Sequence, residues 1–173
     1  LADLSAFVPS RLLDDNAQIM LRFANGARGS LWASQVAVGH ENGLRIRIYG
    51  DQASLEWFQE QPNQLKFCRL GDTAQYLTRG GAAAGDAANA VTRIPGGHPE
   101  GFLEAFANLY RDFANQIEAF TAQNPANDIE LLVPSVTEGV KGVVFVEKAV
   151  ASSENGSVWV SMDYRGPAVK EGF

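Results

Sequence analysis

The sequence predicts the α+β class, with an open, mainly antiparallel β-sheet of about six or seven strands and two main helices packed on one face. Three observations lead to this fold. Apolar and polar residues alternate with the two-residue period of β-strands through most of residues 2–78. The connections between these segments are short, which is typical of an antiparallel meander. Beyond residue 100 the apolar residues recur at helical spacing instead.

The expected strands follow one another closely along the first part of the chain. Asn25-Gly26 supplies the positive-φ pair that is favoured in tight hairpins. The turn Gly39-His40-Glu41-Asn42-Gly43 places three polar side chains between two glycines. A glycine- and alanine-rich excursion at residues 80–90 follows the strands, as a surface loop or a short helical turn. The expected strands cover residues 2–8, 16–23, 27–38, 44–49, 53–59, 65–70 and 76–78.

The first expected helix lies directly after this region and carries a continuous apolar stripe. Pro99 and Glu100 suit its first turn, where a missing N–H is tolerated and a negative charge is favoured. Asn124-Pro125 is expected to end it. Spacings of three and four residues define the stripe, which consists of Phe102, Phe106, Leu109, Phe113, Ile117 and Phe120.

The second expected helix begins near Ser135, which has capping-box spacing to Glu138. Asn155-Gly156 stops this helix, and residues 157–162 are expected to return as a last short strand. No internal repeat or linker divides the chain. We therefore expect one domain over residues 1–162 and a tail over residues 163–173.

The face of the sheet that two helices leave open mixes aromatic, apolar and arginine side chains. This composition is typical of protein interfaces. We expect the open face to pair with a second copy of the chain, and an ordinary amphipathic outer face is the alternative. The residues on this face are Met20, Arg22, Trp32, Arg45, Arg47 and Tyr49.

Composition excludes several classes of partner. The formal charge of −6 and a pI near 4.9 argue against nucleic acid, which binds basic surfaces. No apolar run approaches the roughly 18 residues of a membrane span, so no membrane partner is expected. Cys68, the single cysteine, has no partner for an internal disulfide, which together with the lack of a signal pattern predicts a cytoplasmic location. Because Leu1 begins a strand-like segment without an initiator methionine, we expect a piece of a longer protein.

The common catalytic and cofactor-binding motifs do not occur in the sequence. No G-x-G-x-x-G fingerprint is present, and the glycines of residues 96–101 lack the Lys-Ser/Thr that a phosphate-binding loop requires. There is no C-x-x-C or H-x-x-x-H pair for a metal, and no G-x-S-x-G for a nucleophilic serine. The chain by itself is therefore expected to hold no metal, to bind no cofactor and to contain no identifiable catalytic residue.

Two polar clusters remain as candidate sites. Free N–H groups at a helix start suit the hydroxyls or carboxylates of a ligand. For either histidine, a loop imidazole hydrogen-bonded to backbone is the alternative. If both clusters lie at one end of the sheet, their side chains converge on one cleft. The clusters are Gln35 with His40, Glu41 and Asn42 after a strand, and His98 with Glu100 at the start of the first long helix.

Three stretches of the chain resemble, in their order and spacing, the C-terminal domain of the glucose–fructose oxidoreductase / inositol dehydrogenase (Gfo/Idh/MocA) family. Together they span most of residues 14–160. They are DDNAQIMLRFANGARGSLWASQVAVGHENGLRIRIYGDQASLEW, GGHPEGFLEAFANLYRDFANQIEAF and LVPSVTEGVKGVVFVEKAVASSENGSVWV.

The resemblance implies a large open sheet with helices on one side, following a Rossmann domain. It also implies an enzyme that uses NAD or NADP to oxidise or reduce a hydroxyl of a sugar, polyol or related compound. Family sheets commonly pair face to face into dimers or tetramers. In this family the segment after the long central strand approaches substrate, which implies that Gln35, His40, Glu41 and Asn42 bind substrate and that His98 closes the same pocket.

The chain departs from the family pattern where the chemistry is concentrated. The nucleotide fingerprint, the Glu-Lys-Pro motif and the Asp-x-x-x-His motif all lie upstream of this region in the family, and none is present here. Glu147-Lys148-Ala149 has alanine in place of proline and lies within an expected helix. Neither histidine has aspartate four residues earlier, because Val36 and Ile94 occupy those positions. We therefore expect the Rossmann domain to be missing and the chain to be inactive alone.

The resulting hypothesis is the substrate-binding and oligomerisation domain of an NAD(P)-dependent oxidoreductase that acts on a sugar-like molecule. A non-enzymatic ligand-binding or dimerisation module is the main alternative. A free-standing hydrolase using His98 and Glu100 is a third reading of the same residues.

Overall fold

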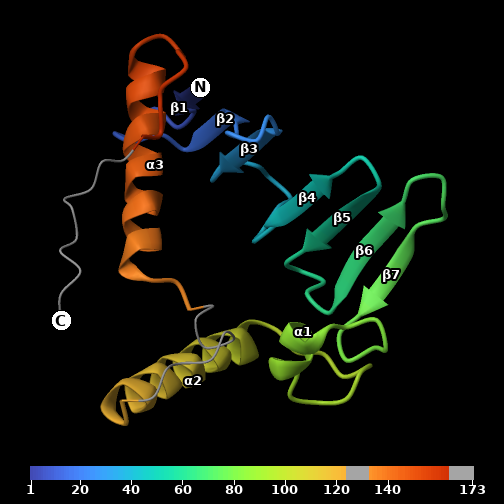
Figure 1. The fold of residues 1–173 in the computed structure, drawn as a ribbon. Coiled ribbons are helices and arrows are strands. Elements are labelled where there is room, and N and C mark those ends of the chain that lie inside the picture. Colours follow the sequence, from blue (N-terminus) through green and yellow to red (C-terminus); the bar gives the residue numbers. More distant parts are fainter. Residues whose placement is uncertain (124–132, 164–173) are drawn as a thin grey trace. The chain divides into compact units, whose positions relative to one another are not determined.

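The computed structural model describes residues 1–123 and 133–163 (Figure 1). Within these residues seven strands are followed by three helices, and every paired strand is antiparallel, which confirms the predicted α+β class. The elements are β1 Ala2–Ser5, β2 Asn16–Arg22, β3 Arg28–Ser34, β4 Arg45–Tyr49, β5 Ala53–Phe58, β6 Gln64–Arg69, β7 Gln75–Thr78, α1 Asp86–Ala90, α2 Phe102–Thr121 and α3 Val136–Glu154.

Hydrogen bonding divides the seven strands into two sheets, each in its own compact unit. Unit 1 contains Leu1–Gly39 and the chain from Pro134 onward, and unit 2 contains His40–Val133. The sheet of unit 1 has the order β1-β2-β3, and that of unit 2 has the order β4-β5-β6-β7. Strand β3 ends at Ser34, whose hydroxyl accepts the N–H of Val36 at 3.3 Å, and the next strand, β4, belongs to the other sheet. The sequence predicted that this strand continues to residue 38 as part of a single sheet.

In unit 1, helix α3 packs against the edge strand β1. The register pairs Ala2 with Ile19 and Ile19 with Leu31, so apolar side chains share one face of the sheet. Ser152 of α3 is 1% exposed; its hydroxyl accepts the N–H of Ala2 at 2.7 Å and donates to the carbonyl of Val158 at 2.6 Å. Helix α3 thus provides hydrogen-bond partners for the free edge of β1, where no further strand is paired within the described residues.

In unit 2, the strands alternate as the sequence predicted. Cross-strand pairing places Glu56 opposite Lys66 and Lys66 opposite Tyr76 on one face. The pair Ile46–Trp57 lies on the other face, which is apolar. One face of this sheet therefore carries charges, and the other carries aliphatic and aromatic side chains.

The helix termini agree with the sequence at α3 and differ at α2. Ser135 and Glu138 form the predicted cap, and the hydrogen bond from the Ser135 hydroxyl lowers the pKa of the Glu138 carboxyl. Helix α2 begins at Phe102, so Pro99 and Glu100 precede it instead of forming its first turn. Both the carboxylate and the backbone of Glu100 bind groups outside the helix. The predicted stop at Asn124-Pro125 lies outside the described residues.

Two further details of the predicted strands are wrong. Residues 157–162 form no strand, because the carbonyl of Val158 accepts from the Ser152 hydroxyl and its N–H donates to the Ser152 carbonyl at 3.3 Å. In the hairpin between β2 and β3, φ is positive at Gly26 (91°) but not at Asn25. The Asn25 side chain instead accepts the N–H of Ala27 at 3.1 Å, which closes a longer turn. The predicted excursion at residues 80–90 does contain a short helical turn, α1.

Asp15 fixes the loop between β1 and β2. It is 3% exposed, and its two carboxylate oxygens accept the N–H groups of Phe7 at 2.9 Å and Val8 at 3.0 Å. These backbone hydrogen bonds, led by that from Phe7, lower the pKa of Asp15, and the nearby Arg11 guanidinium acts in the same direction. The charged carboxylate therefore stabilises the folded loop.

Replacing Ser152 with alanine is expected to destabilise unit 1 by about 1–3 kcal/mol, because the Ala2 N–H and the Val158 carbonyl both lose their partner. Urea unfolding followed by circular dichroism measures the change. Ser161→Ala is the matched control, because that hydroxyl is exposed and bonds only within its own segment. Equal unfolding midpoints for the two variants would contradict this account of the β1 edge.

Asp15→Asn is expected to reduce the acid sensitivity of the fold. Since the folded-state pKa of Asp15 lies below the unfolded value of about 3.9, its stabilisation is present above that pH and disappears as pH falls through the folded pKa. The gap in unfolding free energy between wild type and Asp15→Asn should therefore be larger at neutral pH than near pH 2. Asp14→Asn, at the exposed neighbouring position, is the control. A gap that does not change with pH would show that the charge of Asp15 contributes nothing.

Candidate functional site

The predicted turn before β4 presents its polar side chains to solvent. His40, Glu41 and Asn42 are all exposed, and their side chains form no hydrogen bond or ion pair within the described residues. The turn itself is held by its backbone, because the N–H of Asn42 donates to Glu60 Oε1 at 3.2 Å and the N–H of Leu44 donates to the Asn42 carbonyl at 2.7 Å. The structure therefore fixes the path of the turn and leaves its side chains available to a ligand.

Gln35 follows β3 in unit 1, whereas the turn at residues 40–42 belongs to unit 2. The N–H of Gln35 donates to the carbonyl of Asp15 at 2.8 Å, and its side chain is exposed without a partner in the described chain. Each of these positions is described within its own unit, and their grouping in one site stays a prediction.

His98 lies in the loop that leads into α2, and its imidazole is exposed and unpaired within the part of the chain that the structure describes. Its backbone, in contrast, is held at both ends. The His98 N–H donates to the Pro95 carbonyl at 3.3 Å, and the His98 carbonyl accepts from Arg79 Nη2. As at residues 40–42, a fixed backbone carries a free polar side chain.

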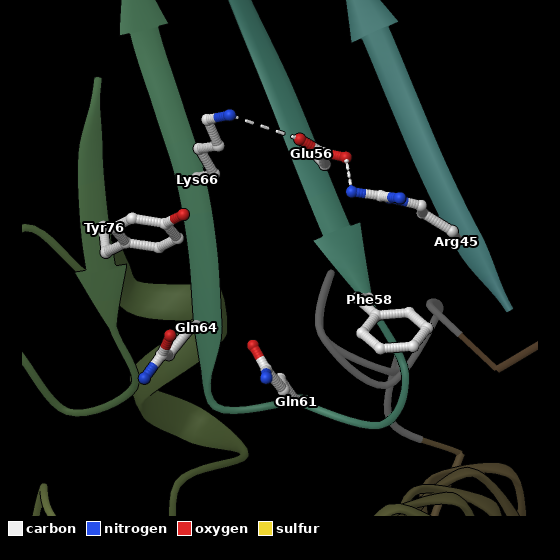
Figure 2. Close-up of a pocket in the computed structure, with 7 residues that line it drawn as sticks. All are labelled: Arg45, Glu56, Phe58, Gln61, Gln64, Lys66 and Tyr76. Atoms are coloured by element: carbon white, nitrogen blue, oxygen red, sulfur yellow. Dashed lines mark ion pairs between the residues drawn. The ribbon is translucent and has the colours of Figure 1, made fainter. Parts of the chain in front are cut away.

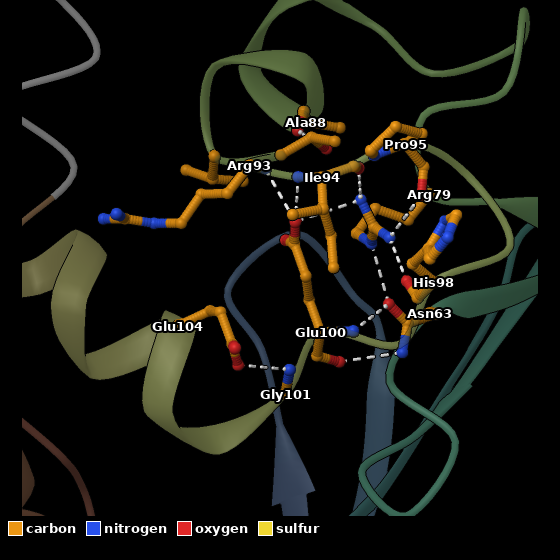
Figure 3. A network of polar contacts seen from close by, with 12 residues as sticks. Asn63, Arg79, Ala88, Arg93, Ile94, Pro95, His98, Glu100, Gly101 and Glu104 are labelled. Atoms are coloured by element: carbon orange, nitrogen blue, oxygen red, sulfur yellow. Dashed lines mark hydrogen bonds and ion pairs between the residues drawn. The ribbon is translucent and has the colours of Figure 1, made fainter.

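A buried polar network holds this loop (Figure 3). Glu100 Oε1 accepts the N–H groups of Arg93 at 2.7 Å and Ile94 at 2.6 Å, and it pairs with Arg79 Nη1 at 3.3 Å. Asn63, in the turn between β5 and β6, donates to the Glu100 carbonyl at 2.8 Å and accepts the Glu100 N–H at 3.1 Å. The loop is thereby attached to the end of the four-stranded sheet.

Helix α2 continues directly from this network. Gly101 precedes it, and the N–H of Gly101 donates to Glu104 Oε2 at 2.8 Å, which lowers the pKa of the Glu104 carboxyl. Glycine has no side chain, so only the carboxylate half of a capping box forms here. The first turn of α2 is thus fixed at the same place as the loop.

A second polar group lies on the charged face of the β4–β7 sheet (Figure 2). Glu56 of the central strand β5 stands between two cations, with Arg45 on one side and Lys66 Nζ at 3.6 Å on the other. A shallow depression of about 100 Å³ lies beside this group. Its lining is completed by Phe58, Gln61, Gln64 and Tyr76.

Several candidate chemistries lack a site in the described residues. No group of three or more His, Cys, Asp or Glu side chains gathers for a metal in residues 1–123 and 133–163. A dinucleotide is normally held where a parallel strand leads through a glycine-rich turn into a helix, and every strand pair described here is antiparallel. A parallel strand-to-helix turn of that kind does not occur in the described residues. No helix in the same residues is long and apolar enough to cross a membrane.

The sequence indicated the histidine loops but missed the residues that hold them. Neither Asn63 nor Arg79 belongs to the two clusters that the sequence indicated. Their partners are backbone atoms and one carboxylate at distant positions, for which local periodicity gives no signal. Among the described residues no hydrogen bond or ion pair joins the turn at residues 40–42 to the His98 loop, so their predicted convergence on one cleft is not tested.

The described residues thus form an antiparallel α+β domain with exposed polar loops. Residues 3–162 match the family model for the "Oxidoreductase family, C-terminal alpha/beta domain" (GFO_IDH_MocA_C). The chain therefore belongs to the Gfo/Idh/MocA oxidoreductase family, and it corresponds to the C-terminal domain of that family.

Similar proteins agree with this assignment. The chain is 39% identical over 161 residues to the uncharacterized oxidoreductase YfiI of Bacillus subtilis, covering 92% of this chain and 41% of that protein. An oxidoreductase structure from Sinorhizobium meliloti is 45% identical with a TM-score of 0.86, over 92% of this chain and 45% of the other. An inositol dehydrogenase homolog from Azotobacter vinelandii, solved with NADH and myo-inositol, is 39% identical with a TM-score of 0.85, over 94% and 43%. The chain thus spans less than half the length of these relatives.

Proposed function

We propose that this chain is the substrate-binding and oligomerisation domain of an NAD- or NADP-dependent oxidoreductase acting on a sugar, polyol or similar hydroxylated molecule. The observation that carries the proposal is the likeness to the Azotobacter vinelandii inositol dehydrogenase homolog, whose structure contains NADH and myo-inositol. The likeness extends over 94% of this chain, and at 39% identity it concerns sequence as well as fold.

Five exposed side chains are proposed to bind the substrate. Imidazole, amide and carboxylate groups provide both donors and acceptors, which a hydroxyl requires because it donates one hydrogen bond and accepts others. None of the five side chains uses this capacity on a partner in the described chain. A hydroxylated ligand can therefore pair with them without breaking an internal contact. The five residues are Gln35, His40, Glu41, Asn42 and His98.

The nicotinamide cofactor is proposed to be held by a different part of the intact protein. A domain over residues 1–162, followed by a tail over residues 163–173, would contribute the substrate side of the active site, and the family match over residues 3–162 supports these bounds.

We propose a cytoplasmic location, in keeping with the free thiol of Cys68. Alone, the chain is proposed to be inactive.

Oligomerisation is proposed to use the open sheet faces. In unit 1, Met20 and Trp32 stand on the face opposite Ile19, and Trp32 is 62% exposed. In unit 2, Arg45 and Tyr49 share the charged face of the sheet, and Tyr49 is 73% exposed. Aromatic and arginine side chains of this kind are enriched in protein interfaces. A second copy of the chain is the proposed partner.

In the intact protein, His40→Ala and His98→Ala are each expected to lower kcat/KM for the sugar or polyol substrate by roughly 5- to 150-fold, the factor that corresponds to about 1–3 kcal/mol for a lost hydrogen bond in a binding site. Steady-state kinetics monitored by NAD(P)H absorbance measures the effect. Gln52→Ala, in the exposed turn between β4 and β5, is the control. Unchanged turnover in both histidine variants, with the oligomer intact, would favour the non-enzymatic binding or dimerisation module.

The isolated chain is expected to bind neither NAD nor NADP measurably and to form a dimer in solution. The reason for the first part is that its described strands offer no parallel strand-to-helix turn for a pyrophosphate. Isothermal titration calorimetry tests cofactor binding, and light scattering tests the mass. Micromolar cofactor affinity would refute the first expectation, and a monomeric mass at micromolar concentration would refute the second.

A further inference from the structure

Arg79, at the end of β7, is the most highly connected cation among the described residues. Its side chain is 15% exposed, and the side chain of its partner Glu100 is 6% exposed. A guanidinium has five N–H donors in a planar fork. Here the guanidinium donates hydrogen bonds to Asn63 Oδ1 at 2.7 Å, to the Ile94 carbonyl at 2.8 Å, to the Pro95 carbonyl at 3.4 Å and to the His98 carbonyl (Figure 3). It also forms the ion pair with Glu100 Oε1 at 3.3 Å.

Two side chains of opposite charge therefore hold the loop before α2, the cation at backbone carbonyls and the anion at backbone N–H groups. The Arg79 guanidinium binds three of its carbonyls, and the Glu100 carboxylate binds the N–H groups of Arg93 and Ile94. Either charge buried alone would be costly, whereas together they satisfy each other and the loop backbone. An ion pair of this kind contributes little net stability compared with apolar packing, but it selects one backbone path.

The backbone at the centre of this loop is suited to close contact with Arg79. A Cβ atom at Gly96 would lie 3.4 Å from the Arg79 carbonyl oxygen, and Gly97 has a φ of 87°, a conformation that side chains disfavour. The positive φ of Gly97 is what requires glycine in this loop, next to His98.

We propose that Arg79 is a positioning residue for substrate binding. Its guanidinium, oriented by Asn63 and Glu100, fixes the backbone of residues 94–98 and so holds the free imidazole of His98 where a substrate hydroxyl meets it. The inference rests on the proposed function, since it assigns a supporting residue to the same site. It extends that function because Arg79 binds the carbonyls of the loop and acts through them.

The test uses the intact oxidoreductase and compares Arg79→Lys, His98→Ala and the double variant. Lysine keeps the charge but cannot reproduce the planar fork that binds Asn63 and three loop carbonyls. Arg79→Lys is expected to raise KM for myo-inositol, or for the most active member of a panel of polyols and sugars, at least tenfold while kcat stays within twofold. Because Arg79 acts through His98, adding Arg79→Lys to His98→Ala should change KM by less than twofold.

Two further variants separate positioning from general stability. Asn63→Ala removes the acceptor that orients Arg79 Nε and is expected to raise KM in the same direction, and it serves in place of Arg79→Lys if that variant fails to fold. Arg69→Lys, an exchange on the exposed end of β6, is the matched control with no expected change. Thermal unfolding of each variant, recorded alongside, shows whether a change in KM simply follows a loss of stability.

The outcomes distinguish this inference from the proposed function. If His98→Ala raises KM and Arg79→Lys does not, or if the two effects multiply in the double variant, positioning by Arg79 is refuted while the proposed function stands. If His98→Ala leaves KM unchanged, the role of His98 and the positioning of its loop are both refuted. An intact protein that oxidises or reduces no member of the panel with NAD or NADP refutes the proposed function, and the inference with it.

Discussion

The structure depends on polar side chains that are buried and satisfied by backbone groups. Glu100 holds the loop before α2 through two N–H groups and one guanidinium, Asp15 holds the loop before β2 through two N–H groups, and Ser152 joins α3 to the edge of β1. The cost of burying an unpaired polar atom makes each arrangement specific, because any other loop path would leave a donor or acceptor unsatisfied. Within each unit, these contacts determine where the loops that leave the sheet stand.

Sequence periodicity predicted the strands, because their pattern depends on the direction of successive side chains. It could not predict contacts between residues that are far apart in the sequence. The strands β2, β4, β5 and β6 were placed to within about a residue or two, the usual uncertainty of element ends, since successive side chains of a strand must point to opposite faces. The cap of α3 was also predictable, because Ser135 and Glu138 lie only three residues apart. The end of β3 was not predictable, because the hydroxyl of Ser34 accepts the backbone N–H of Val36, two residues further on.

The same distinction applies to the candidate site. The exposed histidines were recognisable from sequence, because polar residues flanked by glycines at the end of a strand mark a loop that can carry function. Asn63 and Arg79 were not recognisable, since their partners at Glu100, Ile94 and His98 lie 15–37 residues away and include carbonyl oxygens that every residue possesses. The ion pairs of Glu56 with Arg45 and Lys66 are predictable only in part. They can be inferred from the sequence once the register of β4, β5 and β6 is known.

The distribution of charge favours a neutral, hydroxyl-bearing ligand over an anionic one. Arg79 is paired with Glu100 and Arg45 with Glu56, so an anion that binds at either of these guanidinium groups would have to displace a carboxylate. The formal charge of −6 also opposes the approach of anions. The imidazoles of His40 and His98 and the amide of Asn42, in contrast, are unpaired within the described chain and can exchange hydrogen bonds with hydroxyls at no electrostatic cost. In the described residues the guanidinium groups of Arg79 and Arg45 are thus satisfied by carboxylates, whereas the polar side chains of the candidate loops remain available to the hydroxyls of a polyol or sugar.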